Sequence, residues 1–282
     1  MIRTIAGLRT RLAEARAAAP TGSRVALVST IGALHDGHIA LIRAAREHAD
    51  IVVVSSFVNP LRFATAGEAA AYPRTPDEDA ALLSELGVDI VFAPDVAELL
   101  PDGRVTTRVG AGDLGLRYEG RTRPFYFDGL LTVEAKLLQI VRPDVAVYGA
   151  RDRQRVFLVR RMVRDLFFDV DIVEVDTVRG DDGLPVSTRL DALDGADRAA
   201  AALLPRALAA AASNADRDVD ACIAAAQSTL MGESRIRLEY LSVVDPSTFL
   251  PVDEGYRGPA VALIAASIGE NRFIDNADIF LR

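Results

Sequence analysis

The sequence predicts an α/β protein in which a doubly wound parallel sheet precedes a smaller C-terminal α+β domain. Short runs rich in valine and isoleucine alternate with segments of helical spacing, which is typical of buried parallel strands and their crossover helices. This alternation ends near Arg179, where the turn sequence Gly-Asp-Asp-Gly follows. An alanine-rich helical stretch and several strand-like runs come next. We therefore expect a larger domain over residues 1–178 and a smaller one over 179–282.

Each strand and helix expected in the larger domain follows from a pattern in its own stretch of sequence. The expected strands are apolar runs bounded by polar or turn residues, over 24–30, 50–60, 88–95, 144–150 and 170–178. The expected helices repeat apolar side chains every three or four residues, over 38–49, 75–87, 130–141 and 153–166. The second of these helices begins with Pro76 and several acids, which suits the positive end of a helix dipole.

The smaller domain has a different composition. Alanine-rich helices extend from about Asp197 to Leu230 without a sustained heptad pattern, so they are interpreted as packing scaffold rather than as a coiled coil. Strand-like runs follow over 236–245, 260–269 and 276–282. This mixture predicts an α+β arrangement.

Charge and composition narrow the range of partners. A net charge of −8 and an isoelectric point near 5.0 argue against binding to nucleic acid or to an anionic membrane, so small-molecule partners are favoured. No run approaches the roughly 18–20 uncharged residues that a membrane span needs. Residues 1–20 are amphipathic with several arginines and lack a signal core. Cys222 is the single cysteine, so no intrachain disulfide can form. We expect a cytoplasmic protein.

The segment from Val28 to His38 carries the strongest chemical signal. His35 and His38 are three residues apart at the start of a predicted helix, which puts both imidazoles on one face. Ligands of an open parallel sheet bind beyond the carboxyl ends of its strands, and a helix N-terminus there attracts phosphate. A histidine in this position can also be a helix cap. Two of the chain's three histidines in one turn favour a nucleotide triphosphate site, whereas His48 is expected to be an exposed side chain.

Five segments of the sequence resemble segments of a known family, in the same order and with similar spacing. Val28-STIGALHDGH resembles the HIGH-type motif of nucleotidyl transferases, and in particular the TMGALHEGH segment of pantothenate synthetases (pantoate–β-alanine ligases). Phe57-VNPLRF is similar to that family's FVNPLQF, and Tyr72-PRTPDED to its YPRT segment. Tyr148-GARDRQR resembles FGEKDxQQ, and Val178-RGDDGLPVSTR resembles VREDDGLAMSSR. The resemblance covers about residues 20–195 and is looser beyond them.

The resemblance implies a fold, a reaction and partners. The larger domain would be Rossmann-like, with the smaller domain acting as a lid. ATP and an acid would give an acyl adenylate and pyrophosphate with Mg²⁺, and an amine, β-alanine in the family, would then release AMP. Such chemistry needs cations and hydrogen-bond donors around the phosphates and accurate positioning of the reactants. The family also implies a homodimer formed through the larger domain.

The nucleotide site that the resemblance implies has three parts. His35, His38 and Arg151 would be catalytic, and Asp79 and Asp152 would lie beside Mg²⁺, although acids in a first helical turn can also simply complement the dipole. The implied ATP-binding residues are Thr30, Ile31, Gly32, His35, Gly37, His38, Gly149, Asp152, Val178, Val186, Ser187, Thr188 and Arg189. A capped turn before a surface helix is the structural alternative for the last three.

The acid site departs from the family's pattern. The implied residues are Ile31, Asn59, Arg62, Leu130, Val133, Glu134 and Arg155. Arg62 and Arg155 stand where the family has glutamines, so the pocket gains two positive charges and favours a more acidic ligand or an internal counter-ion. Glu134, at a position that is apolar in the family, can be that counter-ion or can point to solvent. Arg151 replaces a lysine and keeps its charge.

These departures leave three functions open. The first is an ATP-dependent carboxylate–amine ligase that acts on pantoate and β-alanine or on a related, more acidic pair. The second is a plain nucleotidyl transferase that delivers AMP to a phosphate. The third is a non-catalytic or regulatory nucleotide-binding paralogue. Release of pyrophosphate from ATP separates the third from the other two.

Overall fold

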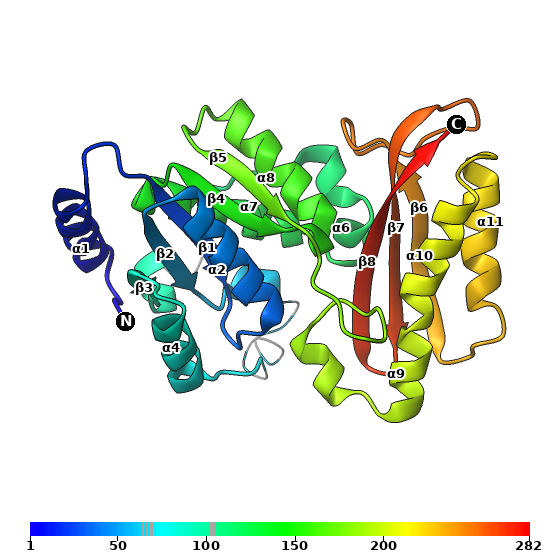
Figure 1. Cartoon of the computed structure of the whole chain (residues 1–282), viewed down its shortest axis with the longest axis horizontal. Helices are drawn as coiled ribbons and strands as arrows, with labels where there is room; N and C mark the ends of the chain where they lie inside the picture. Colours follow the sequence, from blue (N-terminus) through cyan, green and yellow to red (C-terminus); the bar gives the residue numbers. More distant parts are fainter. Residues whose placement is uncertain (64, 66, 68–69, 71, 102–104) are drawn as a thin grey trace. The chain divides into compact units, whose positions relative to one another are not determined.

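A computed structural model describes residues 1–282 except 64, 66, 68–69, 71 and 102–104 (Figure 1). The chain forms two compact units. The first unit is Met1–Ala150 with Leu158–Asp176, and the second unit is Arg151–Phe157 with Thr177–Arg282. The sequence analysis did not anticipate the grouping of Arg151–Phe157 with the second unit. No helix among the described residues is long and apolar enough to cross a bilayer.

A five-stranded parallel sheet in the order β3-β2-β1-β4-β5 forms the centre of the first unit. Its strands are β1 (Val25–Thr30), β2 (Ile51–Ser56), β3 (Ile90–Phe92), β4 (Val145–Gly149) and β5 (Asp171–Val175). The strand order runs one way from β1 to β3 and the other way from β4 to β5, so the sheet is doubly wound and its switch point lies between β1 and β4. The predicted Rossmann-like fold class is confirmed.

Helix α1 precedes β1, and the other helices and 3-10 turns connect the strands. They are α1 (Ile5–Ala18), α2 (Asp36–His48), η1 (Pro60–Arg62), α4 (Pro76–Glu85), α5 (Val96–Leu99), η2 (Gly112–Leu116), α6 (Glu119–Thr122), α7 (Tyr126–Val141), η3 (Ala150–Asp152) and α8 (Arg153–Asp165). Strand β2 ends at Ser56, before the predicted end at 60, because the chain turns into η1 at Pro60, which has no N–H for a ladder bond.

The core beside α2 explains why these strands form. Val28 lies opposite Val54 on β2 and Val147 on β4, and all three side chains are buried. They pack in one cluster with Ile42 and Ala45 of α2. Burial of a valine or isoleucine side chain stabilises the fold by about 1.5–3 kcal/mol, so this cluster fixes the position of α2 against the sheet.

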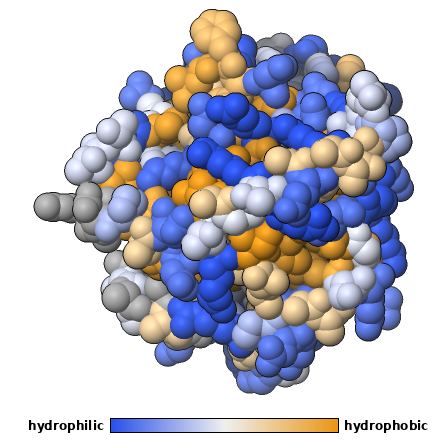
Figure 2. All heavy atoms as spheres, turned by 90° about the vertical axis from the view of Figure 1, so that its left-hand side faces the viewer, coloured by the Kyte–Doolittle hydropathy of each residue, from blue (hydrophilic) through white to orange (hydrophobic). Residues whose placement is uncertain are grey.

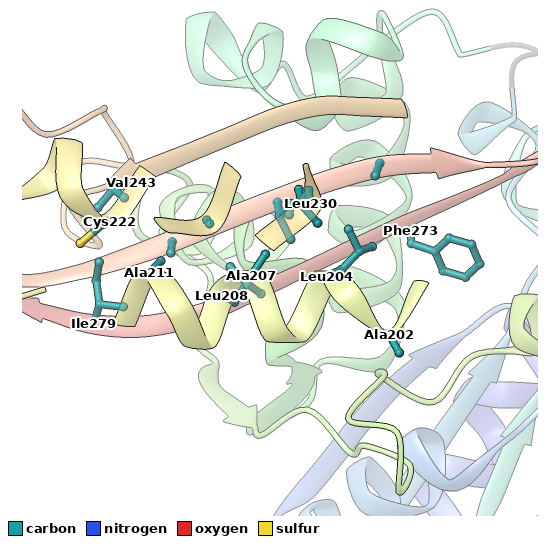
Figure 3. Packing of buried hydrophobic residues seen from close by; sticks show 14 of the residues in the cluster. Ala202, Leu204, Ala207, Leu208, Ala211, Cys222, Leu230, Val243, Phe273 and Ile279 are labelled. Atoms are coloured by element: carbon teal, nitrogen blue, oxygen red, sulfur yellow. The ribbon is translucent and has the colours of Figure 1, made fainter. Parts of the chain in front are cut away.

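The second unit is an antiparallel sheet in the order β6-β7-β8 with helices packed on it. Its elements are η4 (Thr188–Ala192), α9 (Gly195–Ala201), α10 (Leu203–Ser213), α11 (Val219–Leu230), β6 (Ile236–Val244), β7 (Gly258–Ile268) and β8 (Asn271–Leu281). The core holds Leu204 and Leu208 of α10 together with Ile279 of β8 (Figure 3). Cys222 is buried in the same cluster, and burial raises the pKa of its thiol, which makes it unreactive.

Strand β8 begins at Asn271, earlier than the predicted 276. Ile268 pairs with Asn271 across a tight turn, and Gly269 has a φ of 57° there. The first residues of the strand are mostly polar, so their sequence does not indicate a buried strand. Asp275 in particular is buried, which is rare for a charged residue. Its partner, Arg179, is 96 residues away in the chain.

One face of the molecule gathers hydrophobic side chains. In the view from the left-hand side of Figure 1, apolar residues group near the centre and hydrophilic ones surround them (Figure 2).

Candidate functional site

The turn between β1 and α2 is held by the side chains of Thr30 and Asp79. Thr30 ends β1, and its hydroxyl donates to the backbone oxygen of Ser55 on β2 at 3.0 Å. Gly32 and Ala33 then adopt φ values of 82° and 52°. Glycine takes this conformation readily, whereas in alanine it is strained, so the turn needs support from outside.

Asp79 of α4 supplies that support. Its carboxylate, 7% exposed, accepts hydrogen bonds from the backbone N–H groups of Ala33 and Leu34 at 3.0 and 2.9 Å. The hydroxyl of Thr75 donates to it as well, at 3.1 Å. A Cβ added to Gly32 would lie 3.2 Å from Asp79 Oδ2, so the glycine also makes room for the carboxylate. Asp79 therefore positions the turn.

The role of Asp79 beside Mg²⁺ stays a prediction. Two backbone N–H groups and one hydroxyl donate to its two oxygens. Asp152 uses Oδ1 to accept from the backbone N–H of Arg155 at 3.1 Å. Over the described part of the chain, no three His, Cys, Asp or Glu side chains gather as a metal site. These described side chains alone do not form a cation cage.

The two histidines are joined at the start of α2. His35 is the N-cap and its Nδ1 accepts the N–H of Gly37 at 3.1 Å, while Nδ1 of His38 accepts the N–H of His35 at 3.2 Å. The imidazole centroids are 4.1 Å apart. Because Nδ1 of each ring is an acceptor, a neutral ring carries its proton on Nε2, and both rings become Nε2–H donors. The cap and the ligand interpretations of these histidines are thus compatible.

Gly37 is required by the same geometry. A Cβ at this position would lie 2.9 Å from Cε1 and 3.1 Å from Nδ1 of His35. Such contacts are too short, so any larger residue would push the His35 ring away from its cap position. The sequence His-x-Gly-His therefore supplies both imidazole rings, and its glycine leaves the space that the His35 ring occupies.

Asn59 and Arg62 lie where β2 turns into η1. The amide oxygen of Asn59 accepts from the N–H of Leu61 at 3.0 Å, and its amide nitrogen donates to the Gly129 carbonyl at 3.2 Å. Asn59 thus fastens η1 to α7, and a Cβ on Gly129 would lie only 2.5 Å from Leu61 Cβ. Arg62 donates to the hydroxyl of Tyr126 at 2.9 Å.

A second guanidinium lies on the same aromatic ring. Arg123 is 4.2 Å from the Tyr126 centroid and also donates to the backbone oxygen of Arg62 at 2.7 Å. Tyr126 is the first residue of α7, whose N-terminal end adds a partial positive charge. The two guanidinium groups can bind an anionic group such as a carboxylate here, and the first turn of α7 also contains the acid Asp128.

Glu134 is buried on α7, with an exposure of 5%. Its Oε2 accepts hydrogen bonds from the hydroxyls of Ser29 on β1 and Tyr148 on β4, each at 3.1 Å. The alternative in which Glu134 points to solvent is therefore wrong, because two strand hydroxyls solvate the carboxylate inside the protein. Leu130 and Val133, predicted beside it, are buried in the same helix.

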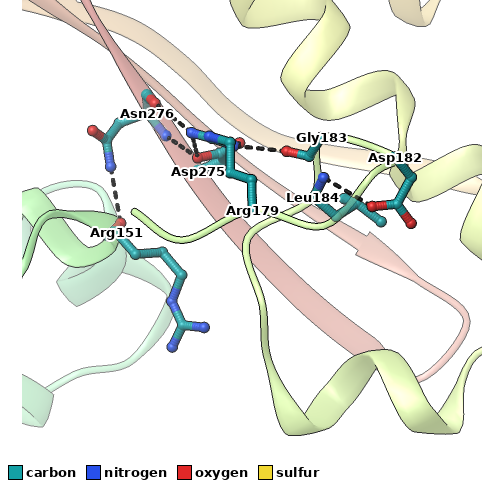
Figure 4. Close-up of polar contacts among 7 residues, drawn as sticks. All are labelled: Arg151, Arg179, Asp182, Gly183, Leu184, Asp275 and Asn276. Carbon is teal, nitrogen blue, oxygen red and sulfur yellow. Dashed lines mark hydrogen bonds and ion pairs between the residues drawn. The ribbon is translucent and has the colours of Figure 1, made fainter. Parts of the chain in front are cut away.

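Arg151 in the second unit is held from two sides. Its Nη1 donates to the backbone oxygen of Val186 at 3.1 Å, and its own backbone oxygen accepts from Asn276 Nδ2 at 2.9 Å (Figure 4). Val186 donates its N–H to the backbone oxygen of Val178 at 2.9 Å. Three residues predicted at the nucleotide site, Arg151, Val178 and Val186, are thus connected in this unit.

An ion pair fixes the turn that follows Val178. Arg179 donates two hydrogen bonds to Asp275, at 2.7 and 2.9 Å, and a third to the Gly183 carbonyl at 2.9 Å (Figure 4). The hydrogen bond from Arg179 to Asp275 raises the pKa of Arg179. Asp275 is 3% exposed, so removal of its partner would leave a buried charge, which typically costs about 3–5 kcal/mol.

The predicted phosphate-binding residues Ser187, Thr188 and Arg189 form the start of η4. Ser187 is its N-cap, and its Oγ accepts the N–H of Arg189 at 3.3 Å. The capped-turn alternative describes this local structure well. It leaves the hydroxyl of Thr188 and the guanidinium of Arg189, both at least partly exposed, outside the cap.

The predicted residues divide between the two units. The first unit contains Thr30, Ile31, Gly32, His35, Gly37, His38, Asn59, Arg62, Asp79, Leu130, Val133, Glu134 and Gly149. The second contains Arg151, Asp152, Arg155, Val178, Val186, Ser187, Thr188 and Arg189.

Sequence reasoning missed the partners that hold the site residues in place. Ser29 and Tyr148 directly follow the paired residues Val28 and Val147, so the strand register would have placed both hydroxyls at one level of the sheet. The turn-holding role of Asp79 has no comparable signal, because an acid in the first turn of a helix complements the dipole wherever its side chain points.

Comparisons with known proteins agree over the whole chain. The model of a family described as pantoate-beta-alanine ligase matches residues 1–278. The chain is 51% identical to the pantothenate synthetase of Leifsonia xyli subsp. xyli, over 97% of this chain and 94% of the relative. Identity to the Thermobifida fusca pantothenate synthetase is 47%, over 95% and 94% of the two chains.

Two solved structures share the fold. The crystal structure of pantothenate synthetase from Thermus thermophilus matches with a TM-score of 0.88 and 41% identity, over 98% of each chain. The pantoate-beta-alanine ligase from Francisella tularensis, described as complexed with beta-gamma ATP and beta-alanine, matches with a TM-score of 0.78 and 30% identity, over 98% and 97% of the chains.

Proposed function

The chain belongs to the pantoate–β-alanine ligase family, and we propose that it joins pantoate to β-alanine through an acyl adenylate formed from ATP. The observation that carries the proposal is the histidine pair. His35 and His38 lie at the N-terminus of the 13-residue helix α2, which follows the carboxyl end of β1, and Nδ1 of each ring accepts a backbone N–H. A helix N-terminus at this edge of a parallel sheet attracts phosphate, which supports the proposal.

The reaction takes two displacements. A carboxylate oxygen of pantoate attacks the α-phosphorus of ATP, and the bond to the bridging oxygen of pyrophosphate breaks. The neutral amine of β-alanine then attacks the acyl carbon, AMP leaves, and the amine gives up a proton. Negative charge moves onto phosphate oxygens in both steps, so the Nε2–H donors and the α2 dipole stabilise the transition states more than the ground states. No covalent nucleophile from the protein is required.

The remaining nucleotide contacts follow from charge and hydrogen-bonding capacity. Arg151 and Arg189 supply guanidinium donors for the triphosphate, and Ser187 and Thr188 supply hydroxyls. Arg151 is already oriented by its bond to the Val186 carbonyl, which supports a fixed position for its planar fork. We place Gly149, Asp152 and Val178 beside the adenosine.

The acid is recognised at the N-terminal end of α7. We propose that Arg62 and Arg155 bind the carboxylate, with Leu130 and Val133 as apolar lining and Asn59 as the residue that positions η1. Support comes from the guanidinium groups of Arg62 and Arg123 beside Tyr126, the first residue of α7.

Three finer statements belong to the same proposal. Mg²⁺ enters with ATP, bound to the phosphate oxygens, which are the hard ligands that it prefers. Two copies pair through the larger unit, as the family resemblance implies, and light scattering in solution would check this. The reaction occurs in the cytoplasm, where ATP is supplied.

A single assay tests the function. Purified protein with ATP and Mg²⁺ is offered pantoate or a dicarboxylate, with and without β-alanine, and both pyrophosphate and amide are measured. Pyrophosphate with pantoate and amide with β-alanine are expected. Turnover only with a dicarboxylate would indicate that the enzyme acts on the related, more acidic substrate pair. A stable adenylylated phosphate would indicate a nucleotidyl transferase, and ATP binding without pyrophosphate would indicate a non-catalytic paralogue.

A further inference from the structure

Two successive residues of β8, Asp275 and Asn276, are polar and buried, with exposures of 3% and 7%. Side chains of successive strand residues point to opposite faces of a sheet, so the two can contact different segments of the chain. Asp275 binds Arg179 and Asn276 binds Arg151, and all four residues belong to the second unit. These two residues of one strand therefore connect with the segment that carries a predicted phosphate-binding arginine.

Asn276 holds the main chain of Arg151. Its Nδ2 atom donates to the backbone oxygen of Arg151 at 2.9 Å. The Arg151 side chain is half-buried and extends away from Asn276 (Figure 4). The hydrogen bond therefore fixes the point at which this side chain leaves the main chain.

Asp275 acts on the other end of the Arg151 side chain through Arg179. Arg179 donates two hydrogen bonds to Asp275 and one to a carbonyl of its own turn, so this turn is fastened to β8. The turn closes where the N–H of Val186 donates to the backbone oxygen of Val178 at 2.9 Å. The backbone oxygen of Val186 accepts from Nη1 of Arg151 at 3.1 Å. The carbonyl that orients the guanidinium group is consequently tied to the same strand as the main chain of Arg151.

We propose that Asp275 and Asn276 are positioning residues, which hold the Arg151 guanidinium group in the orientation that binds the triphosphate. The inference rests on the proposed function, in which Arg151 contacts phosphate. A lysine ammonium binds phosphate as a point charge, whereas a guanidinium group is a planar fork whose N–H groups point in fixed directions. An arginine at this position therefore depends more on orientation, and two neighbouring residues of β8 supply it at both ends of the side chain.

A double-mutant cycle between Asn276 and Arg151 tests the inference. The readout is kcat/KM for ATP in pyrophosphate release, with Mg²⁺, pantoate and β-alanine present. Arg151→Ala should lower it by about 100-fold, as expected for a lost donor to the reacting phosphates. Asn276→Ala should lower it by about 10-fold, because the donor is present but misplaced. In the Arg151→Ala background, Asn276→Ala should lower it by less than about twofold, since no guanidinium group is left to position.

The cycle separates positioning from stability. A variant that only unfolds part of the protein lowers the rate by the same factor with or without the Arg151 side chain. Asn214→Ala is the matched control, because its Nδ2 atom also donates to a backbone carbonyl at 2.9 Å, at the end of α10 in the same unit. Asn214→Ala should keep kcat/KM within about twofold of the wild-type value.

A second variant keeps the test decisive if Asn276→Ala does not fold. Arg179→Lys retains a positive charge opposite Asp275 but loses the fork that also reaches the turn, and it should lower kcat/KM by about 3- to 10-fold only when Arg151 is present. Equal factors with and without the Arg151 side chain would overturn the inference. A wild-type kcat/KM in folded Asn276→Ala or in Arg151→Ala would do the same. Absence of pyrophosphate with the wild-type protein would instead refute the proposed function itself.

Discussion

Replacing Asp79 with asparagine should loosen the turn that carries the two histidines. The carboxylate accepts three hydrogen bonds, from Ala33, Leu34 and Thr75, and asparagine offers one oxygen and turns an NH₂ group toward the other donors. A hydrogen bond to a charged group contributes about 1.5–3 kcal/mol. Asp77→Asn is the matched control, since it is exposed in the same first turn of α4 and loses only the dipole interaction of about 0.3–1 kcal/mol.

The difference between the two variants should therefore be about 1–2.5 kcal/mol. Urea denaturation of the whole chain measures its effect on stability. The same loss can instead appear as opening of the turn in the folded protein. In that case the ATP affinity measured by calorimetry should fall by roughly 5- to 60-fold, because 1.4 kcal/mol corresponds to a tenfold change. Equal stability and equal ATP affinity in Asp79→Asn and Asp77→Asn would show that the carboxylate does not support the turn.

Three further changes have defined outcomes. Gly37→Ala should displace the His35 ring, because the new Cβ would lie 2.9 Å from Cε1 of that ring. ATP affinity should fall by about tenfold, and the free energy of unfolding should fall by about 1 kcal/mol. An unchanged ATP affinity would contradict this. Gly129→Ala should lower the free energy of unfolding by about 1–3 kcal/mol, whereas Gly110→Ala, where an added Cβ meets nothing within 4 Å, should leave it unchanged. Burial would raise the pKa of Glu239, but hydrogen bonds from serine and arginine neighbours outweigh it and hold the pKa below its usual 4.5. Its stabilising contribution is present above the unfolded pKa and lost as pH falls through the lowered folded pKa, so the urea midpoint should drop less between pH 6 and 3 in Glu239→Gln; a parallel drop in both proteins would count against it.

The larger unit was predictable because its strands are apolar on both faces. Val28, Val54 and Val147 lie opposite one another in continuous hydrophobic runs, and the turn residues between those runs leave few alternatives. The histidine spacing likewise specifies one face of a helix. The start of β8 was not predictable, because Asp275 becomes acceptable in a buried strand only through a distant arginine.

The function of the acids in the site lay beyond sequence patterning. Asp79 and Glu134 both appear as carboxylates on helices, and no local pattern shows that one holds a backbone turn while the other accepts two strand hydroxyls. Such roles depend on long-range contacts, which only the folded chain defines. Ser29 does carry a signal, because a hydroxyl group near the end of a buried strand needs a hydrogen-bond partner, which here is Glu134.

Calorimetric titration of ATP together with pyrophosphate release, in His35→Ala, His38→Ala and His48→Ala, tests the phosphate site most directly. His48 lies on the same helix, is exposed, and its ring nitrogen Nδ1 lies 2.8 Å from the Ala44 carbonyl oxygen, so it controls for loss of an imidazole. The first two variants should each lose about 10- to 100-fold in ATP affinity or turnover, as expected for a lost bond to a charged phosphate. If all three variants behave alike, the histidine pair does not bind the nucleotide.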